Sequence, residues 1–264
     1  MPKITYIIPI WANTTKKELD LSLTSLIKEL EYISQIIIVH DGKDSFLIKP
    51  NSSLEILDKK ILHLYLYFNK GPGIARNYGC IFSKSNYIFF LDAGDESLPK
   101  RIQNQLPLVI KNGFSYGHIK EVDFNGNEYI KKSVSSYKKA LRLLPYRSPF
   151  CNVTLAIKKN IFFEIGGFPS LRIAEDWVLM SKILKKFKSI SVVDDVLVNV
   201  NLGEDFIYRR RGLKKIFTIL KALMIIKETE LIPSYKIVFS ALIQISLRLL
   251  PSNLLKMVYL ILRS

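Results

Sequence analysis

Apolar runs alternate with helical patterns in the first part of the chain. Residues 4–11 form a short apolar run, and residues 36–39 are all β-branched, which is typical of a strand covered on both faces. Between them, Thr15 and Glu18 have the spacing of a helix capping box, and apolar residues then recur at helical intervals to Leu30. The pattern predicts a strand, a helix and a second strand, joined as a right-handed βαβ unit.

The same alternation continues to Leu91. A strand is expected over residues 62–68, a helix over residues 74–83 after a glycine turn, and a further strand that ends at Leu91. The first half should therefore form a parallel α/β sheet. In such sheets the loops after the strands meet at the carboxyl edge, so they can converge on one ligand.

Further along, the predicted elements become shorter and mixed. A hairpin is expected over residues 122–129 around an Asn-Gly-Asn turn, and a strand over residues 152–157. A helix should run over residues 175–187, and a strand over residues 192–200 should close the sheet. The predicted fold class is thus α/β, with a mixed, mostly parallel sheet flanked by helices.

Two amphipathic helices are predicted after the sheet, over residues 213–228 and 235–249. The polar stripe is Lys214, Thr218, Lys221 and Glu228 in the first helix and Lys236, Ser240, Gln244 and Arg248 in the second. Each helix is expected to bury a broad apolar face, either against the other helix and the sheet or partly in a membrane interface. We divide the chain into a sheet domain, 1–203, and a basic helical tail, 204–264, for which membrane association is slightly favoured.

Charge indicates the class of partner. The chain has 39 Lys and Arg against 23 Asp and Glu, and its last 64 residues hold 11 basic against 4 acidic residues. Such a tail suits phospholipid, nucleic acid or a phosphorylated substrate. Because no nucleic-acid-binding motif is recognised, we expect no nucleic acid partner. The longest uncharged C-terminal run, between Lys236 and Arg248, is shorter than the roughly 20 residues that span a bilayer, so no transmembrane helix is predicted.

The chain should fold without a disulfide. With 264 residues and 48% hydrophobic content, it can bury one substantial core. Its two cysteines, Cys80 and Cys151, are expected to be buried free thiols, as in a reducing compartment. The three histidines lie far apart in the sequence without metal-ligand spacing, and we assign them no role.

Two acidic residues follow an apolar strand in Leu91-Asp92-Ala93-Gly94-Asp95. Such a pair is often only a helix cap in a solvated turn. At the carboxyl edge of an α/β sheet, however, one or two carboxylates suffice for a divalent cation whose other ligands are phosphates and water. The turn is therefore a candidate metal and diphosphate site.

Two further loops at this edge carry candidate ligand contacts. Asp41 follows an apolar strand, where its carboxylate could accept hydrogen bonds from a base or ribose, although a simple turn has the same pattern. Residues 71–77 begin a helix with Arg76 in its first turns, able to face a phosphate. A dinucleotide fingerprint would need a third glycine where Arg76 stands, so we reject that interpretation.

A second acidic pair, Glu175 and Asp176, begins a later helix. Carboxylates at a helix start are commonly placed there by the helix dipole alone. The functional alternative is a general base that takes a proton from an attacking hydroxyl group, a contribution of roughly 10²–10⁴ in rate. The aromatic neighbours of this pair suit that second role.

Together, these motifs resemble family 2 glycosyltransferases of the GT-A fold over roughly residues 3–200, and the resemblance implies a Rossmann-like, nucleotide-binding sheet. Six segments stand in the family's order: Ile7-Ile8-Pro9-Ile10-Trp11, Val39-His40-Asp41-Gly42, residues 71–77, residues 90–95, Gly166-Gly167-Phe168 and Glu175-Asp176-Trp177. In the tail, Arg209-Arg210-Arg211-Gly212 and Arg248-Leu249-Leu250-Pro251 are similar to the amylovoran-type exopolysaccharide and capsule glycosyltransferases.

The resemblance implies a nucleotide-sugar donor, usually a UDP-sugar, a divalent cation, Mn²⁺ or Mg²⁺, and an inverting single displacement. It assigns donor binding to Pro9, Trp11, Asp41, Arg76 and Asp92, metal binding to Asp95 with Asp92, and general base catalysis to Asp176, with Glu175 as the alternative. The family often has three acids in the turn, and here Gly94 occupies the middle acidic position.

The implied acceptor is a hydroxyl group of a lipid-linked oligosaccharide in bacterial capsule, exopolysaccharide or O-antigen synthesis. This acceptor implies a cytoplasmic protein, peripheral on the inner face of the cytoplasmic membrane. A polyprenyl phosphate or lipopolysaccharide core is an alternative acceptor. A non-catalytic, membrane-associated binding protein of the same fold is a further alternative, prompted by Gly94.

Overall fold

Helices and strands alternate along the chain of this computed structural model, which describes residues 2–51, 54–123, 126–202 and 213–250. The strands are β1 (Ile4–Ile10), β2 (Ile33–Asp41), β3 (Ile61–Leu66), β4 (Tyr87–Phe90), β5 (Glu96–Ser97), β6 (Phe114–Val122), β7 (Glu128–Lys131), β8 (Ala156–Lys158) and β9 (Val192–Asn201). The helices are α1 (Lys16–Ser25), α2 (Glu55–Asp58), α3 (Pro72–Phe82), α4 (Arg101–Asn112), α5 (Tyr137–Leu143), α6 (Lys159–Glu164), α7 (Glu175–Phe187), α8 (Leu213–Glu228) and α9 (Ser234–Leu249). Three 3₁₀ segments are η1 (Ile27–Tyr32), η2 (Lys43–Ser45) and η4 (Asn152–Thr154).

The sheet has the strand order β3-β2-β1-β4-β8-β6-β9-β5, and β7 pairs with β6 outside this path. Strands β1 to β4 are parallel, as predicted. Side chains of β1 alternate between two cores: Tyr6 and Ile8 share one with α1, and Ile7 shares the other with α3. At Gly79 of α3 a Cβ would lie 2.7 Å from the Ile7 side chain, so glycine permits the close packing. The helices thus cover opposite faces, which explains the continuous apolar runs.

The first helix begins as predicted but ends earlier. Thr15 and Glu18 form the capping box at its start. The predicted continuation to residue 30 is wrong, because α1 stops at Ser25 and the chain tightens into η1. This tighter turn buries Glu29, whose carboxylate accepts a hydrogen bond of 3.0 Å from a backbone N–H in the first turn of α4. The apolar repeat continues, but in a different kind of helix.

The second half of the sheet is mixed. Strand β8 is antiparallel to β4 and to β6 and so joins the two halves. Strands β6 and β7 form the predicted hairpin, although turn residues 124–125 lie outside the described residues. The strand expected over residues 152–157 is wrong in its first part, where η4 forms because the Thr154 hydroxyl donates to the carbonyls of Cys151 and Gly117. The predicted mixed α/β class is confirmed.

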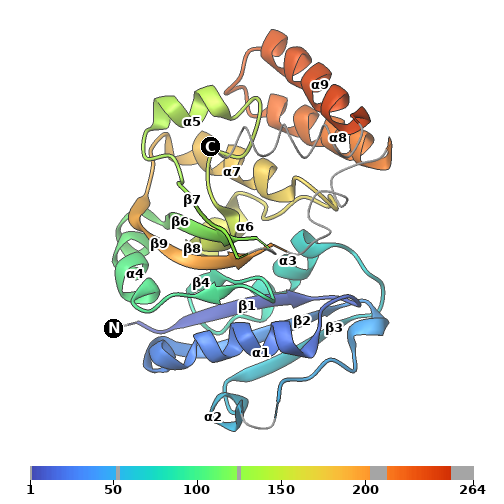
Figure 1. Ribbon diagram of the computed structural model, residues 1–264. Coiled ribbons are helices and arrows are strands. Elements are labelled where there is room, and N and C mark those ends of the chain that lie inside the picture. The colour runs from blue at the N-terminus through green and yellow to red at the C-terminus, as the bar shows by residue number, and fades with distance from the viewer. Residues whose placement is uncertain (1, 52–53, 124–125, 203–212, 251–264) are drawn as a thin grey trace.

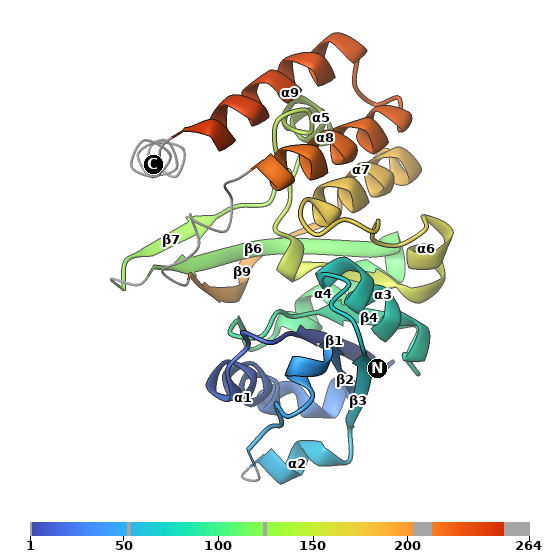
Figure 2. The same cartoon turned by 90° about the vertical axis from the view of Figure 1, so that its right-hand side faces the viewer.

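Helices α8 and α9 lie at the end of the molecule farthest from β1 to β3 (Figures 1 and 2). The inner face of α8, including Ile219, Leu223 and Ile226, joins the core that also contains α7. Across the described ranges, no helix has the length and apolarity needed to span a bilayer. The division at residue 203 stays a prediction because residues 203–212 lie outside the described part of the chain, as do the motif at residues 209–212 and Pro251.

The polar stripe of α9 lies partly inside the protein. Ser240 is fully buried and donates a hydrogen bond to the Pro145 carbonyl, and Gln244 donates one of 2.8 Å to the Tyr146 carbonyl. Apolar side chains such as Val238 and Phe239 are exposed instead. This side of α9 therefore does not pack on the protein, and its burial in a membrane interface stays a prediction.

Both thiols and His40 are buried in structural positions, and His63 is partly buried. Cys80 and Cys151 are buried and free, which confirms that interpretation. His40 and His63, distant in the sequence, meet with Nε2 and Nδ1 2.9 Å apart. Burial lowers the pKa of His40 to about 4, so this ring is neutral at pH 7. The contact ties β2 to β3 and gives no sign of a ligand site.

Candidate functional site

A cavity of about 490 Å³ opens at the carboxyl edge of β1, β2 and β4. Its lining comprises Pro9, Ile10, Trp11, Thr14, Asp41, Asn69, Gly71, Pro72, Arg76, Asp92, Ala93, Arg172 and Glu175. The structure thus brings together six of the predicted site residues from distant parts of the chain. Asp95 and Asp176 do not line this cavity. The predicted convergence of the loops after the parallel strands is confirmed.

Asp41 organises the floor of the cavity. Its carboxylate accepts hydrogen bonds from the backbone N–H groups of Lys70 at 2.7 Å and Gly71 at 2.8 Å. Gly71 has a φ of 93°, in the region that favours glycine, so the loop turns back toward β2 at this point. The carboxyl group is almost fully buried, and it holds the loop after β3 against the end of β2.

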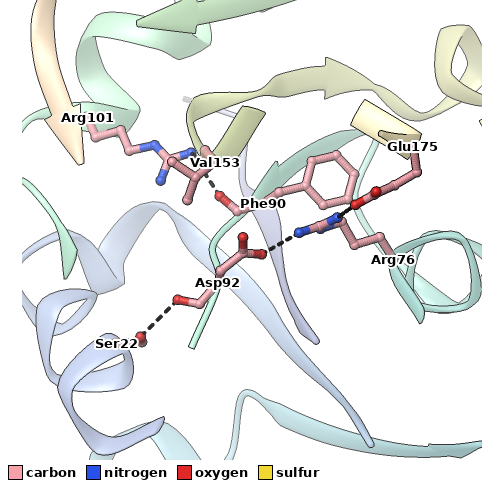
Figure 3. Close-up of polar contacts among 7 residues, drawn as sticks. All are labelled: Ser22, Arg76, Phe90, Asp92, Arg101, Val153 and Glu175. Carbon is pink, nitrogen blue, oxygen red and sulfur yellow. Dashed lines mark hydrogen bonds and ion pairs between the residues drawn. The ribbon is translucent and has the colours of Figure 1, made fainter. Parts of the chain in front are cut away.

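Arg76 joins three elements at the centre of the site (Figure 3). Its Nη2 lies 2.6 Å from Asp92 Oδ1, and its Nη1 lies 3.2 Å from Glu175 Oε1. Burial would lower the pKa of Arg76, but the two carboxylates outweigh that effect and raise it. Arg76 therefore reaches the cavity while its charge is shared by two carboxylates, and its contact with a phosphate stays a prediction.

Close packing of α3 on α7 makes this contact possible. At Gly73 of α3, a Cβ would lie 2.9 Å from Glu175 Cγ, so a larger residue would push the helices apart. The Arg76 guanidinium carbon also lies 5.3 Å from the Phe168 ring centroid. The Phe168 ring therefore also supports the arginine.

Hydrogen bonds from side chains to backbone carbonyls fix the acidic turn after β4. The Ser22 hydroxyl donates to the carbonyls of Asp92 and Asp95, and Asn201 donates to the carbonyl of Gly94 at 2.8 Å. Gly94 has a φ of 96°, a conformation that strains any residue with a Cβ. This geometry gives a physical reason for the glycine at the position where the family often has an acid.

The two carboxyl groups of the turn have different environments. The Asp92 side chain is 42% exposed, whereas Asp95 as a whole is 7% exposed. Burial raises the pKa of Asp95 well above its usual range, and the neighbouring Asp92 carboxylate adds to the effect. A nearby cation would favour the charged form of both groups.

Arg101, which carries no sequence signature, supports the same turn from inside the protein. It is fully buried, and its Nη2 donates to the carbonyls of Phe90 at 2.9 Å and Val153 at 3.0 Å (Figure 3). Its Nε donates to Gln105. Arg101 therefore fixes the end of β4 directly before Asp92.

The start of α7 carries the other acidic pair. Burial raises the pKa of Glu175 to about 7, and Asp176 adds to this shift while Arg76 opposes it. Asp176 is only partly buried. The next residue anchors the helix, since the Trp177 indole donates to the Leu144 carbonyl at 2.8 Å. The two carboxyl groups therefore have unequal access to solvent and to ligands.

One cavity residue that sequence reasoning missed is Arg172. This exposed side chain donates to the side-chain oxygen and the carbonyl of Asn69, at 3.0 and 2.9 Å. Its position just before the Glu175-Asp176 pair was the only available signal. It places a second guanidinium at the rim, outside the buried network of Arg76.

The carboxylate oxygens of the acidic turn suit a cation whose other ligands come mainly from a bound diphosphate. Within the described ranges, no group of three or more His, Cys, Asp or Glu side chains could hold a metal by itself. Asp92 and Asp95 supply hard oxygen atoms three residues apart. A cation bound to a diphosphate needs only one or two such carboxylates.

Comparison with known proteins gives this arrangement a family context. A family model described as "Glycosyl transferase family 2" matches residues 5–172. The chain is 26% identical to UDP-Gal:alpha-D-GlcNAc-diphosphoundecaprenol beta-1,3-galactosyltransferase of Escherichia coli, over 98% of this chain and 95% of the relative. It is 23% identical to the amylovoran biosynthesis glycosyltransferase AmsE of Erwinia amylovora, over 96% of each chain.

Solved structures of S. aureus TarS share the fold. The complex with UDP superposes with a TM-score of 0.59 at 20% identity, covering 84% of this chain and 65% of TarS residues 1–349. The complex with UDP-GlcNAc gives a TM-score of 0.61 at 19% identity, covering 89% and 69%. At such identities the likeness concerns the fold alone, and it confirms the predicted GT-A architecture.

Proposed function

The chain belongs to glycosyl transferase family 2, and on this premise we propose that it transfers a sugar from a UDP-sugar to a hydroxyl group of a lipid-linked oligosaccharide. The observation that carries the proposal is the cavity where Asp41, Arg76 and Asp92 meet at the carboxyl edge of the sheet. The relatives support the substrates, since one is named for UDP-Gal and a diphosphoundecaprenol-linked acceptor and another for amylovoran biosynthesis. We place the reaction in bacterial capsule, exopolysaccharide or O-antigen synthesis.

The donor would lie along the cavity. Pro9 and the 41% exposed Trp11 form an apolar wall suited to the base. Asp41 orders the loop beneath the nucleotide. Because Arg76 is already paired with two carboxylates, Arg172 at the rim is the better placed cation for the diphosphate.

A divalent cation, Mn²⁺ or Mg²⁺, fits the acidic turn. Asp92 and Asp95 would hold it, and the raised pKa of Asp95 is the state expected of a buried carboxyl group whose counter-charge is a ligand. When bound, the cation supplies positive charge to the departing diphosphate. The turn itself is held rigid by Ser22 and Asn201, so its carboxyl groups need little reorganisation.

Asp176 would act as the general base. Its carboxylate takes the proton from the acceptor hydroxyl group while that oxygen forms a bond to the anomeric carbon of the donor sugar. The bond from this carbon to the diphosphate oxygen breaks, and the diphosphate leaves with the electron pair. Attack from the side opposite the leaving group inverts the configuration. Glu175 is less suitable for this role because it is buried and paired with Arg76.

The glycine at position 94 no longer favours the alternative of a non-catalytic binding protein. It was prompted by the missing acid at Gly94, and the φ of 96° at that residue is a conformational reason for glycine that is independent of catalysis. A cytoplasmic location, peripheral on the inner face of the membrane, remains part of the proposal because a lipid-linked acceptor would lie there.

The direct test is a panel of UDP-sugars with a lipid-linked acceptor, assayed for UDP release and product with and without manganese. One donor should give manganese-dependent product, and the Asp95→Ala variant should lose it. Absence of turnover with every UDP-sugar, or equal turnover by the variant, would contradict the proposal.

A further inference from the structure

One face of α9 exposes large apolar side chains. Tyr235, Val238, Phe239 and Leu242 are between 56% and 70% exposed. Together with Tyr146 and Lys236 they line an open groove of about 400 Å³. A contiguous apolar surface of this kind marks an interaction site more often than a solvated helix face.

Specific contacts hold α9 in this orientation. The hydroxyl of Ser240 and the side-chain amide of Gln244 donate to two successive carbonyls, those of Pro145 and Tyr146. The Tyr146 and Phe239 rings meet edge to face with centroids 6.4 Å apart. The helix therefore uses polar residues to attach inward and presents apolar residues outward.

The segment that contacts α9 carries exposed basic residues. Lys138, Lys139 and Arg142 on α5, and Arg147 just after it, are all exposed. The sequence contains no Asp or Glu between Glu128 and Glu164, and none after Glu230. The segment that contacts α9 therefore carries positive charge and contains no acidic residue that would neutralise it.

We propose that these residues form a docking surface for an anionic phospholipid bilayer. We define the α9 face as Tyr235, Val238, Phe239 and Leu242 with the exposed cations of the segment that contacts α9, Lys138, Lys139, Arg142 and Arg147. The apolar side chains enter the boundary between headgroups and acyl chains, and the cations contact the anionic headgroups. A second copy of the chain is a poorer occupant, because it would bring the same cations together. This surface would give a physical basis to the peripheral location in the proposed function, and its link to a lipid-linked acceptor rests on that function.

The apolar part is tested by flotation of the full chain with vesicles of phosphatidylcholine alone or mixed with phosphatidylglycerol. Wild type should bind the mixed vesicles, and Phe239→Ser/Leu242→Ser should bind them about tenfold or more weakly. The matched control is Leu47→Ser/Ile56→Ser, which removes a 93% exposed side chain after η2 and a 62% exposed side chain on α2, the helix at the opposite end in both views. It should bind as wild type does.

The cationic part is tested with Lys138→Gln/Lys139→Gln/Arg142→Gln. This variant should lose about tenfold or more in affinity for the mixed vesicles. Its control is Lys28→Gln/Lys59→Gln/Lys84→Gln, which removes the same charge from exposed positions in the first half of the chain.

Three results would overturn the inference. Wild-type binding by both α9-face variants would do so, as would equal losses in the variants and their controls, which would indicate attraction by net charge alone. A concentration-dependent dimer that forms without vesicle binding, and that Phe239→Ser/Leu242→Ser abolishes, would assign the face to a second copy. Circular dichroism and UDP affinity, unchanged across all variants, separate these results from misfolding and from failure of the proposed function.

Discussion

The turn after β4 and the first turn of α7 each carry two carboxyl groups, and each pair has one buried and one more accessible member. Asp95 and Glu175 are each 7% exposed, whereas Asp92 and Asp176 are more accessible. Burial raises the pKa of both buried groups. The pairs differ in the member that meets Arg76, which is the accessible Asp92 in the turn and the buried Glu175 in the helix.

This difference indicates how similar pairs acquire different roles. In the turn, Arg76 compensates Asp92, and the buried Asp95 is left without an ion-pair partner among the described residues, a state that suits cation binding. In the helix, Arg76 compensates the buried Glu175, so the accessible Asp176 can meet an acceptor hydroxyl group. One guanidinium thus links the turn of the proposed metal site to the start of the helix that carries the proposed base.

Removing the Arg76 guanidinium, which joins the two pairs, should have the largest effect. Arg76→Ala leaves a buried Glu175 and a partly buried Asp92 without their cation, so the free energy of unfolding should fall by about 3–5 kcal/mol. Urea unfolding measures the loss. Arg172→Ala removes an exposed arginine at the same cavity and should cost less than about 1 kcal/mol. Similar losses in the two variants would show that Arg76 does not hold the pairs together.

Removing the Asp95 carboxylate from the turn should have an intermediate effect. Asp95→Asn removes the proposed metal contact, so the manganese concentration for half-maximal transfer should rise by at least about 10- to 100-fold, the scale seen for loss of a supporting metal contact. Manganese titrations of transfer rate would measure it. Glu31→Gln, an exposed change on η1, should leave the titration curve in place. An unshifted curve for Asp95→Asn would remove Asp95 from the metal site.

The pH dependence of stability concerns a single buried group, Glu175. The pKa of Glu175 rises from 4.5 to about 7 on folding, so the native state binds the proton more tightly than the unfolded state. Its contribution to stability is therefore fully present below about pH 4.5 and is lost as the pH rises through about 7. Glu175→Gln should make unfolding free energy less dependent on pH across that window. An unchanged slope between pH 4.5 and 7 would contradict the buried environment of Glu175.

The parallel half of the fold could be predicted because its signals are local. The capping box at Thr15, the β-branched run of β2 and the glycine turn before α3 each specify an element from neighbouring residues. The carboxyl-edge rule then placed Asp41, Arg76 and Asp92 together without any knowledge of side-chain contacts.

The remaining features depend on contacts across long sequence distances. Arg76 and Glu175 are 99 residues apart, and their ion pair depends on Gly73 allowing α3 to approach α7. Arg101 is held by carbonyl groups, which every residue has, so no side-chain pattern marks it. The polar stripe of α9 was visible, but its inward direction was set by carbonyls of the segment after α5.

The most direct test of the different roles is the turnover number of Asp176→Asn and Glu175→Gln, measured in parallel at saturating donor and acceptor. The account predicts that Asp176→Asn loses about 10²–10⁴ in turnover with UDP affinity retained, while Glu175→Gln stays within about tenfold of wild type. The opposite order, with Glu175→Gln inactive and Asp176→Asn close to wild type, would contradict it.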